Sequence, residues 1–132
     1  MMKEVYVSSR RREELIDITH EIERFIMEEG IEEGFVVIYV PHTTAGIVIN
    51  EGFDPDVGKD IIETLRKLIP EHGDYRHSEG NSDAHIKSSL LGESKIIPVK
   101  NGKLMLGTWQ RVFFFEGDGP RKRRIILGVI RL

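Results

Sequence analysis

The stretch Phe35–Val40 (FVVIYV) is an uninterrupted run of six apolar residues. Its residues are apolar at both odd and even positions, a pattern typical of a central strand that is covered on both faces. Pro41 ends the run, and the apolar pattern resumes at residues 46–50 (GIVIN) after a polar interruption, HTT, at residues 42–44. The sequence therefore predicts two buried strands with a polar turn between them.

A helix is expected on either side of these two strands. Upstream, apolar residues recur at helical spacing from Thr19 to Gly30, with Thr19 as the expected N-cap and Gly30 as the stop. Downstream, Asp54 is suited to cap a helix that begins at Pro55 and closes before Pro70. Its apolar residues form one stripe, so we expect this helix to pack on a sheet.

The other apolar runs are expected to pair as hairpins of neighbouring strands. These pairs are residues 3–7 with 13–18, 95–99 with 103–106 about Asn101–Gly102, and 108–115 with 124–130. A short helix is expected at 84–91. Because hairpins dominate over β–α–β alternation, we expect one α+β domain over residues 1–132. It would be a largely antiparallel two-layer β-sandwich with helices packed on an outer face.

The composition limits the possible functions. With no cysteine among 132 residues, any metal must be held by histidine, carboxylate or amide ligands. The formal net charge is −3 with acids and bases interspersed, so no basic face for nucleic acid is expected. No apolar run approaches the roughly 18 residues of a membrane span, and no signal-like stretch opens the chain, so we expect a cytoplasmic protein. Abundant glutamate and arginine with one glutamine favour a thermophilic source.

The segment Tyr75–His85 (YRHSEGNSDAH) concentrates imidazoles, carboxylates and an amide in eleven residues. In an extended conformation, alternate side chains from His77 to His85 would share one side. With a turn at Gly80 and a helix from Asp83, the two histidines would still converge. Either geometry suits a cation or a phosphate, while a solvated glycine-containing loop is the alternative.

Three other polar clusters lie at the ends of expected strands, at residues 42–44, 50–54 and 116–121. The histidine of the first is either a ligand or a hydrogen-bonded turn residue. Glu51 follows a buried strand, where a carboxylate needs a cationic, metal or hydrogen-bonding partner. Arg121 suits bidentate recognition of phosphate or carboxylate, although a tight hairpin also explains its surroundings. We expect all four clusters to meet on one rim.

Four motifs in this order, HTTAGIVINEGFDPDV, HSEGNSDAH, LGTWQ and EGDGPR, resemble those of the YjbQ family, also described as secondary thiamine-phosphate synthases. The resemblance covers the chain from Val5 onward. It implies a compact α+β sandwich that assembles as a homotrimer, with a polar pocket near subunit boundaries. It also implies a divalent metal, zinc in some relatives with magnesium or manganese as alternatives, held by His42, His77 and His85.

The resemblance also implies the residues around that metal and their chemistry. The catalytic candidates are Glu51, Glu116 and Arg121, and the substrate-binding candidates are Thr43, Asn50, Asn81, Gln110, Asp118 and Arg121. The implied reaction joins hydroxymethylpyrimidine diphosphate to a thiazole phosphate and releases pyrophosphate, with Arg121 on the diphosphate. The alternatives are a zinc-dependent hydrolase of a small phosphorylated substrate and a non-catalytic binder of a small anionic metabolite. No nucleic acid or membrane partner is expected.

Overall fold

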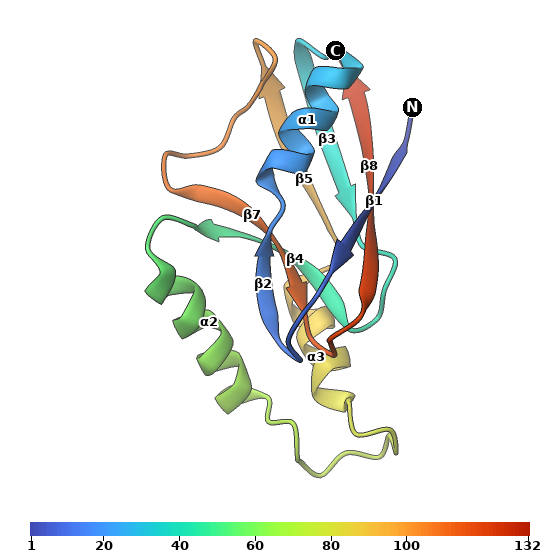
Figure 1. Cartoon of the computed structure of the whole chain (residues 1–132), viewed down its shortest axis with the longest axis vertical. Coiled ribbons are helices and arrows are strands. Elements are labelled where there is room, and N and C mark those ends of the chain that lie inside the picture. The colour runs from blue at the N-terminus through green and yellow to red at the C-terminus, as the bar shows by residue number, and fades with distance from the viewer.

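The computed structural model describes all 132 residues and contains two antiparallel sheets and three helices (Figure 1). The five-stranded sheet has the order β1-β8-β3-β5-β6, and the three-stranded sheet has the order β2-β7-β4. The strands are β1 (Lys3–Ser8), β2 (Glu14–Asp17), β3 (Glu33–Tyr39), β4 (Ala45–Glu51), β5 (Ser94–Lys100), β6 (Lys103–Leu104), β7 (Gln110–Glu116) and β8 (Lys122–Arg131). The helices are α1 (Thr19–Glu29), α2 (Pro55–Leu68) and α3 (Ser82–Leu91). The predicted α+β class with antiparallel sheets is confirmed.

The hydrophobic core lies between the two sheets and α1. Val36 of β3, Ile47 of β4 and Phe114 of β7 are fully buried in one cluster. Helix α1 adds Ile22 and Phe25 to this cluster, because its apolar residues recur three and four positions apart. The expectation that the helices pack on an outer face is therefore wrong for α1, which covers the inner face of the large sheet beside the small sheet (Figure 1).

The central strand β3 is covered on one face only. Its inward residues Val36 and Ile38 are 0% exposed, but the residues between them face outward. In this chain no element covers that face, so the prediction of burial on both faces is wrong. The outward apolar residues on β3 and its neighbours are Phe35, Val37, Tyr39 (44% exposed), Ile96 (61%) and Ile130 (51%).

Two of the three expected hairpins do not form. β1 pairs with β8 and β2 pairs with β7, so the chain changes sheet both between β1 and β2 and between β7 and β8. The two crossing segments bind each other instead: the Ser9 N–H donates to the Arg121 carbonyl (3.0 Å), and the Gly119 N–H donates to the Arg12 carbonyl (2.9 Å). Only the β5–β6 hairpin forms as predicted, turning at Asn101–Gly102, where both φ angles are positive.

The helix ends follow the sequence signals with one exception. Gly30 ends α1 in the left-handed conformation, and Asp54 caps α2 by accepting the Asp56 N–H (3.0 Å). Thr19 is not a cap, because it lies inside α1 and its hydroxyl accepts the Val112 N–H (2.9 Å) of β7. This bond ties α1 to the small sheet.

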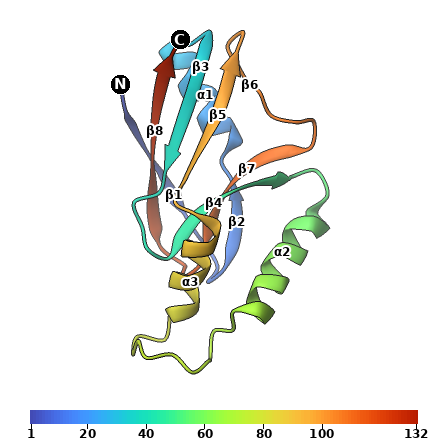
Figure 2. The ribbon, with the colours of Figure 1, turned by 180° about the vertical axis from the view of Figure 1, so that it is seen from behind.

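Helices α2 and α3 lie at the end of the molecule away from α1 (Figure 2). Helix α3 packs beneath β4, whereas α2 touches mainly β2. Within α2 only Leu65 is buried and Leu68 is 71% exposed, so this helix packs on the sheet less completely than its apolar stripe predicts. None of the three helices is long and apolar enough to cross a membrane.

Candidate functional site

A cavity of about 870 Å³ opens where the end of β3, the start of α3 and the connection from β7 to β8 meet. Only two of its 15 lining residues are hydrophobic, so a ligand there would be held by polar groups. The structure brings together residues from three of the four polar clusters. The candidates among its lining residues are His42, Thr43, Asn81, His85, Asp118 and Arg121.

The fourth cluster does not reach this cavity. Strand β4 begins at Ala45, beside the cavity, and ends at Glu51, so its seven residues separate the two ends by about 20 Å. Glu51 accepts the N–H groups of Phe53 (2.7 Å) and Asp54 (3.3 Å) and so shapes the loop that enters α2. Asn50 and Gln110 lie at the same far end of the small sheet. The roles expected of Asn50, Glu51 and Gln110 stay predictions without geometric support in this chain.

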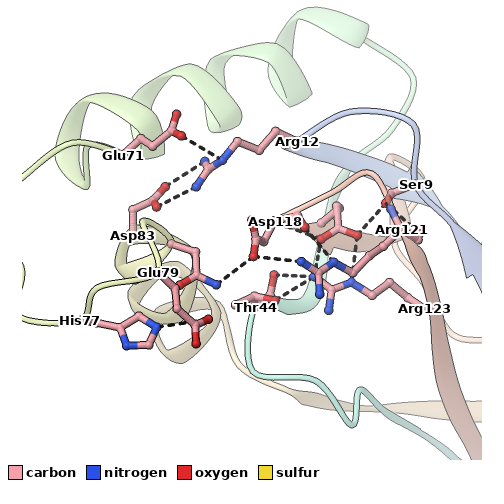
Figure 3. Close-up of polar contacts among 12 residues, drawn as sticks. Ser9, Arg12, Thr44, Glu71, His77, Glu79, Asp83, Asp118, Arg121 and Arg123 are labelled. Atoms are coloured by element: carbon pink, nitrogen blue, oxygen red, sulfur yellow. Dashed lines mark hydrogen bonds and ion pairs between the residues drawn. The ribbon is translucent and has the colours of Figure 1, made fainter.

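The three histidines expected to bind a metal do not form one centre. The rings of His77 and His85 meet edge to face with centroids 5.3 Å apart, and His77 Nε2 lies 3.7 Å from Glu79 Oε2 (Figure 3). His42 lies elsewhere on the cavity wall, where its Nε2 accepts the Arg124 N–H (3.1 Å). No group of three His, Asp or Glu side chains is arranged to hold a metal ion. The residues present therefore do not fit the expected three-histidine centre.

The buried carboxylate of Glu116 joins three segments at the cavity rim. It accepts hydrogen bonds from Arg123 Nε (2.9 Å), Ser9 Oγ (2.7 Å) and the Asp118 N–H (2.9 Å). Burial acts to raise the pKa of Glu116, but the bonds from Arg123 and Ser9 outweigh it, so the pKa lies below its ordinary value. Arg123 also donates to Thr44 Oγ1 (2.8 Å), which fixes the turn between β3 and β4.

Arg121 is the accessible cation of the cavity. Its side chain is 51% exposed and is oriented by Asp118, whose carbonyl accepts from Nε (2.9 Å) and whose carboxylate accepts from Nη2 (3.1 Å). Nη1 makes no hydrogen bond within the chain. Asn81 donates to the same carboxylate (2.9 Å), while its Oδ1 is the only buried side-chain polar atom without a partner. Buried acceptors ordinarily have a hydrogen-bond partner, so a ligand or a water molecule that donates to this oxygen would fit here.

Behind the cavity lies a buried ion network that the sequence reasoning missed. Lys87 and Asp83 are both 0% exposed, and Lys87 Nζ donates to Asp83 (2.8 Å) and Glu13 (2.9 Å). Arg12 donates to both Asp83 oxygens (3.1 and 2.9 Å) and lies 3.3 Å from Glu71 (Figure 3). Burial acts to raise the pKa of Asp83, but the bonds from Arg12 and Lys87 outweigh it and lower the pKa.

This network anchors the helix that carries His85 and follows Asn81. The available sequence signal was the four-residue spacing of Asp83 and Lys87, which places both on one face of a helix. Their partners Arg12 and Glu13 lie about seventy residues earlier in the chain, so spacing alone could not find them.

His42 is kept neutral by its surroundings. Burial is the largest cause that lowers the pKa of His42, and the positive charge of Arg123 lowers it further. The negative charge of Glu116 acts in the opposite direction but is smaller. The imidazole is therefore uncharged near neutral pH.

The fold and the site define a class of protein: a small α+β domain of two antiparallel sheets with a polar cavity at the strand ends. The family model described as UPF0047 protein YjbQ-like matches residues 3–132, and the chain belongs to this family. It is 53% identical over 130 residues to UPF0047 protein MJ1081 of Methanocaldococcus jannaschii, covering 98% of this chain and 94% of that protein. It is 52% identical over 124 residues to UPF0047 protein YugU of Bacillus subtilis, covering 93% and 94%.

Solved structures agree with this assignment. The crystal structure of a conserved YjbQ/UPF0047 family protein from Clostridium acetobutylicum superposes with a TM-score of 0.96 at 48% identity, covering 97% of this chain and 99% of that one. The crystal structure of protein APE1520 from Aeropyrum pernix gives a TM-score of 0.95 at 37% identity, covering 100% and 99%. The family expected from the four motifs is thereby confirmed.

Proposed function

We propose that this chain is an enzyme with thiamine phosphate synthase-like activity, which joins hydroxymethylpyrimidine diphosphate to a thiazole phosphate and releases pyrophosphate. The observation that carries the proposal is the polar cavity into which Arg121, His42, Asn81 and Asp118 converge from three separate segments. Its volume of about 870 Å³ lies within the usual range for small-molecule sites.

In this reaction the main barrier is the separation of charge as the diphosphate leaves. Arg121 is suited to bind the leaving diphosphate, because its Nη1 is free and Asp118 already fixes its orientation. A preoriented cation stabilises developing negative charge without reorganising as the reaction proceeds. Arg121 is therefore the residue on which we place the diphosphate.

Glu116 and Glu51 take different places in this proposal. In this reaction a carboxylate can serve either proton transfer or orientation. Glu116 is fully buried and accepts from Arg123 and Ser9, which favours an orienting role at the rim. Glu51 is engaged with the loop before α2 and does not line the cavity that holds Arg121.

No step is assigned to a metal, because the three histidines do not fit one centre. Zinc, with magnesium or manganese as alternatives, is tested separately by elemental analysis of protein purified without an affinity tag or added metal. Stoichiometric metal that is lost when His77 and His85 are both replaced by alanine would return a cation to the proposal. Metal that is absent or unaffected would remove it.

We also propose that the chain assembles as a homotrimer. The support is the apolar outer face of the large sheet, where Ile96 and Ile130 are 61% and 51% exposed beside β3. Contiguous exposed apolar surface of this kind marks interaction sites. Light scattering should give three times the chain mass of 15.2 kDa, and Ile96→Lys should reduce it. A monomeric wild type would reject the proposal.

The activity is tested by incubating the purified protein with both substrates and measuring thiamine phosphate and pyrophosphate. Arg121→Ala should raise the KM for the diphosphate substrate about tenfold or more, because a charge-assisted contact is lost. Arg24→Ala, an exposed change on α1, is the matched control and should leave the kinetics unchanged. Unchanged kinetics in Arg121→Ala would contradict the assignment.

The same assay separates the alternatives. Hydrolysis of a phosphorylated substrate by the zinc-loaded protein alone would favour the hydrolase. A ligand-induced rise in melting temperature without turnover would favour the non-catalytic binder.

A further inference from the structure

Strand β3 ends at Tyr39, opposite Ile126, whereas β8 already begins at Lys122. A backbone N–H in the first part of β8 is therefore left without a partner in β3. Tyr39 is the last residue of β3 and pairs with Ile126, so the same register would place Pro41 opposite Arg124. The chain instead turns away after Val40, whose N–H donates to the Glu93 carbonyl (2.7 Å). The His42 ring takes the vacant place, and its Nε2 accepts the Arg124 N–H (3.1 Å). Because buried backbone N–H groups require an acceptor, this lone pair is committed to the fold.

That hydrogen bond also fixes the tautomer of His42. A neutral imidazole that accepts through one nitrogen carries its proton on the other, so Nδ1 is an N–H donor. Nδ1 makes no hydrogen bond within the chain, and it is not buried, since the only buried partnerless polar atom is Asn81 Oδ1. His42 lines the cavity, and Nδ1 is the ring nitrogen that the fold leaves without a partner.

We infer that His42 is a neutral hydrogen-bond donor, through Nδ1–H, to an anionic oxygen of a phosphorylated ligand and is not a metal ligand. A metal on Nδ1 would require the proton to move to Nε2, where it would face the Arg124 N–H. A metal on Nε2 would take the acceptor from that N–H. His42 lines the same cavity as Arg121, whose Nη1 is free, so we place one phosphate group between these two residues. The identification of the ligand as phosphorylated rests on the proposed function.

The tautomer is tested by nitrogen NMR of protein labelled at its histidine nitrogens, with His42→Ala used to assign the signals. At neutral pH, Nδ1 of His42 should be the protonated nitrogen and Nε2 the unprotonated one. Added zinc should leave both signals in place, and added inorganic pyrophosphate should shift Nδ1. A proton on Nε2, or a zinc-induced shift of either His42 nitrogen, would overturn the inference.

Two substitutions separate the donor from its structural role. His42→Gln can offer Oε1 to the Arg124 N–H but places no donor where Nδ1 lies, whereas His42→Ala removes both groups. We expect His42→Gln to keep a melting temperature near that of the wild type while its Kd for pyrophosphate rises about tenfold or more. His20→Ala, an exposed change on α1, is the control and should change neither. Pyrophosphate binding that His42→Gln restores to wild-type strength would overturn the inference.

The outcomes distinguish this inference from the proposed reaction. Pyrophosphate binding that depends on His42, in a protein that forms no thiamine phosphate, would support the donor role and reject the synthase reaction. A wild-type protein that binds neither pyrophosphate nor inorganic phosphate would overturn the donor role, whatever reaction the protein performs.

Discussion

Glu116 and Asp83 are both fully buried, ionised carboxylates bound by arginine, yet they hold different parts of the molecule together. Glu116 lies on β7 and pairs with Arg123 on β8, so it joins the small sheet to the large one. Asp83 lies on α3 and pairs with Arg12 from the loop before β2, so it joins a helix to the sheets. One pair therefore secures the framework, and the other secures an element that carries site residues.

The two carboxylates also differ in what their cationic partners would still bind if the carboxylate were replaced. Without Glu116, Arg123 keeps only the hydroxyl and carbonyl of Thr44 and has no other carboxylate. Without Asp83, Lys87 keeps Glu13 and Arg12 keeps Glu71. Loss of one partner is most costly where the remaining charge is buried and unpaired. The comparison therefore predicts a larger effect at Glu116.

The largest effect is expected for Glu116→Gln. It should lower the free energy of unfolding by about 3–5 kcal/mol, because Arg123 is then a buried cation without a counter-charge. Denaturant unfolding measures the loss. Glu63→Gln, an exposed change on α2, should stay within about 0.5 kcal/mol of the wild type. A smaller loss of stability than in Asp83→Asn would contradict the prediction that Glu116 matters more than Asp83.

Asp83→Asn should cost about 2 kcal/mol, because each of its two cations retains another carboxylate. We expect the effect to be concentrated in α3, with faster amide hydrogen exchange there than in the sheets. Exposed Asp60→Asn is the matched control. Exchange that accelerates equally throughout both sheets would show that Asp83 secures the framework as well.

Acid should act on both carboxylates in the same direction. Each has a folded pKa below its ordinary value, which is 4.5 for Glu116 and 3.8 for Asp83. Their contribution is therefore fully present above these ordinary values and is lost as the pH falls through the lower folded pKa values. Unfolding measured from pH 7 down to about pH 2 should show this loss, and it should be smaller in Glu116→Gln. An identical acid profile in that variant would exclude Glu116 as a source.

The smallest effect is expected for Thr44→Val, which separates the contribution of the Thr44 hydroxyl to binding Arg123 from that of Glu116. It removes the hydroxyl that accepts from Arg123 (2.8 Å) but keeps the volume and the Glu116 pair, so the loss should be about 1 kcal/mol. Thr108→Val, an exposed change, should have no measurable effect on unfolding. A loss as large as that of Glu116→Gln would mean that Thr44, rather than the ion pair, secures the rim.

Features set by a few adjacent residues could be predicted from the sequence. Gly30 ends α1, Asp54 caps α2 and Asn101–Gly102 turn a hairpin, because each depends on local backbone chemistry. The pairing of β1 with β8 could not be predicted in this way, since it depends on contacts more than a hundred residues apart. Alternating apolar residues specify a strand but not its neighbour.

The site was predictable in part for a related reason. Three polar clusters converge because two of them follow the ends of β3 and β7, and the third opens α3, which packs against β4. Glu51 does not join them, because it is the last residue of β4, whereas Thr44 directly precedes the first residue of that strand. The order of residues along β4 already contained this information, and the expectation of one shared rim overlooked it. The buried partners of Asp83 were beyond reach, because charged residues are ordinarily assigned to the surface.

The position of β8 has a consequence for how the protein is made. It lies between β1 and β3 in the large sheet, although it is formed by residues 122–131. During synthesis β3 can pair with β5 once residues 94–100 are made, but β1 has no neighbour until residues 122–131 leave the ribosome. The first strand therefore waits, unpaired, while more than a hundred further residues are made, and its docking depends on contacts that are distant in sequence and slow to form.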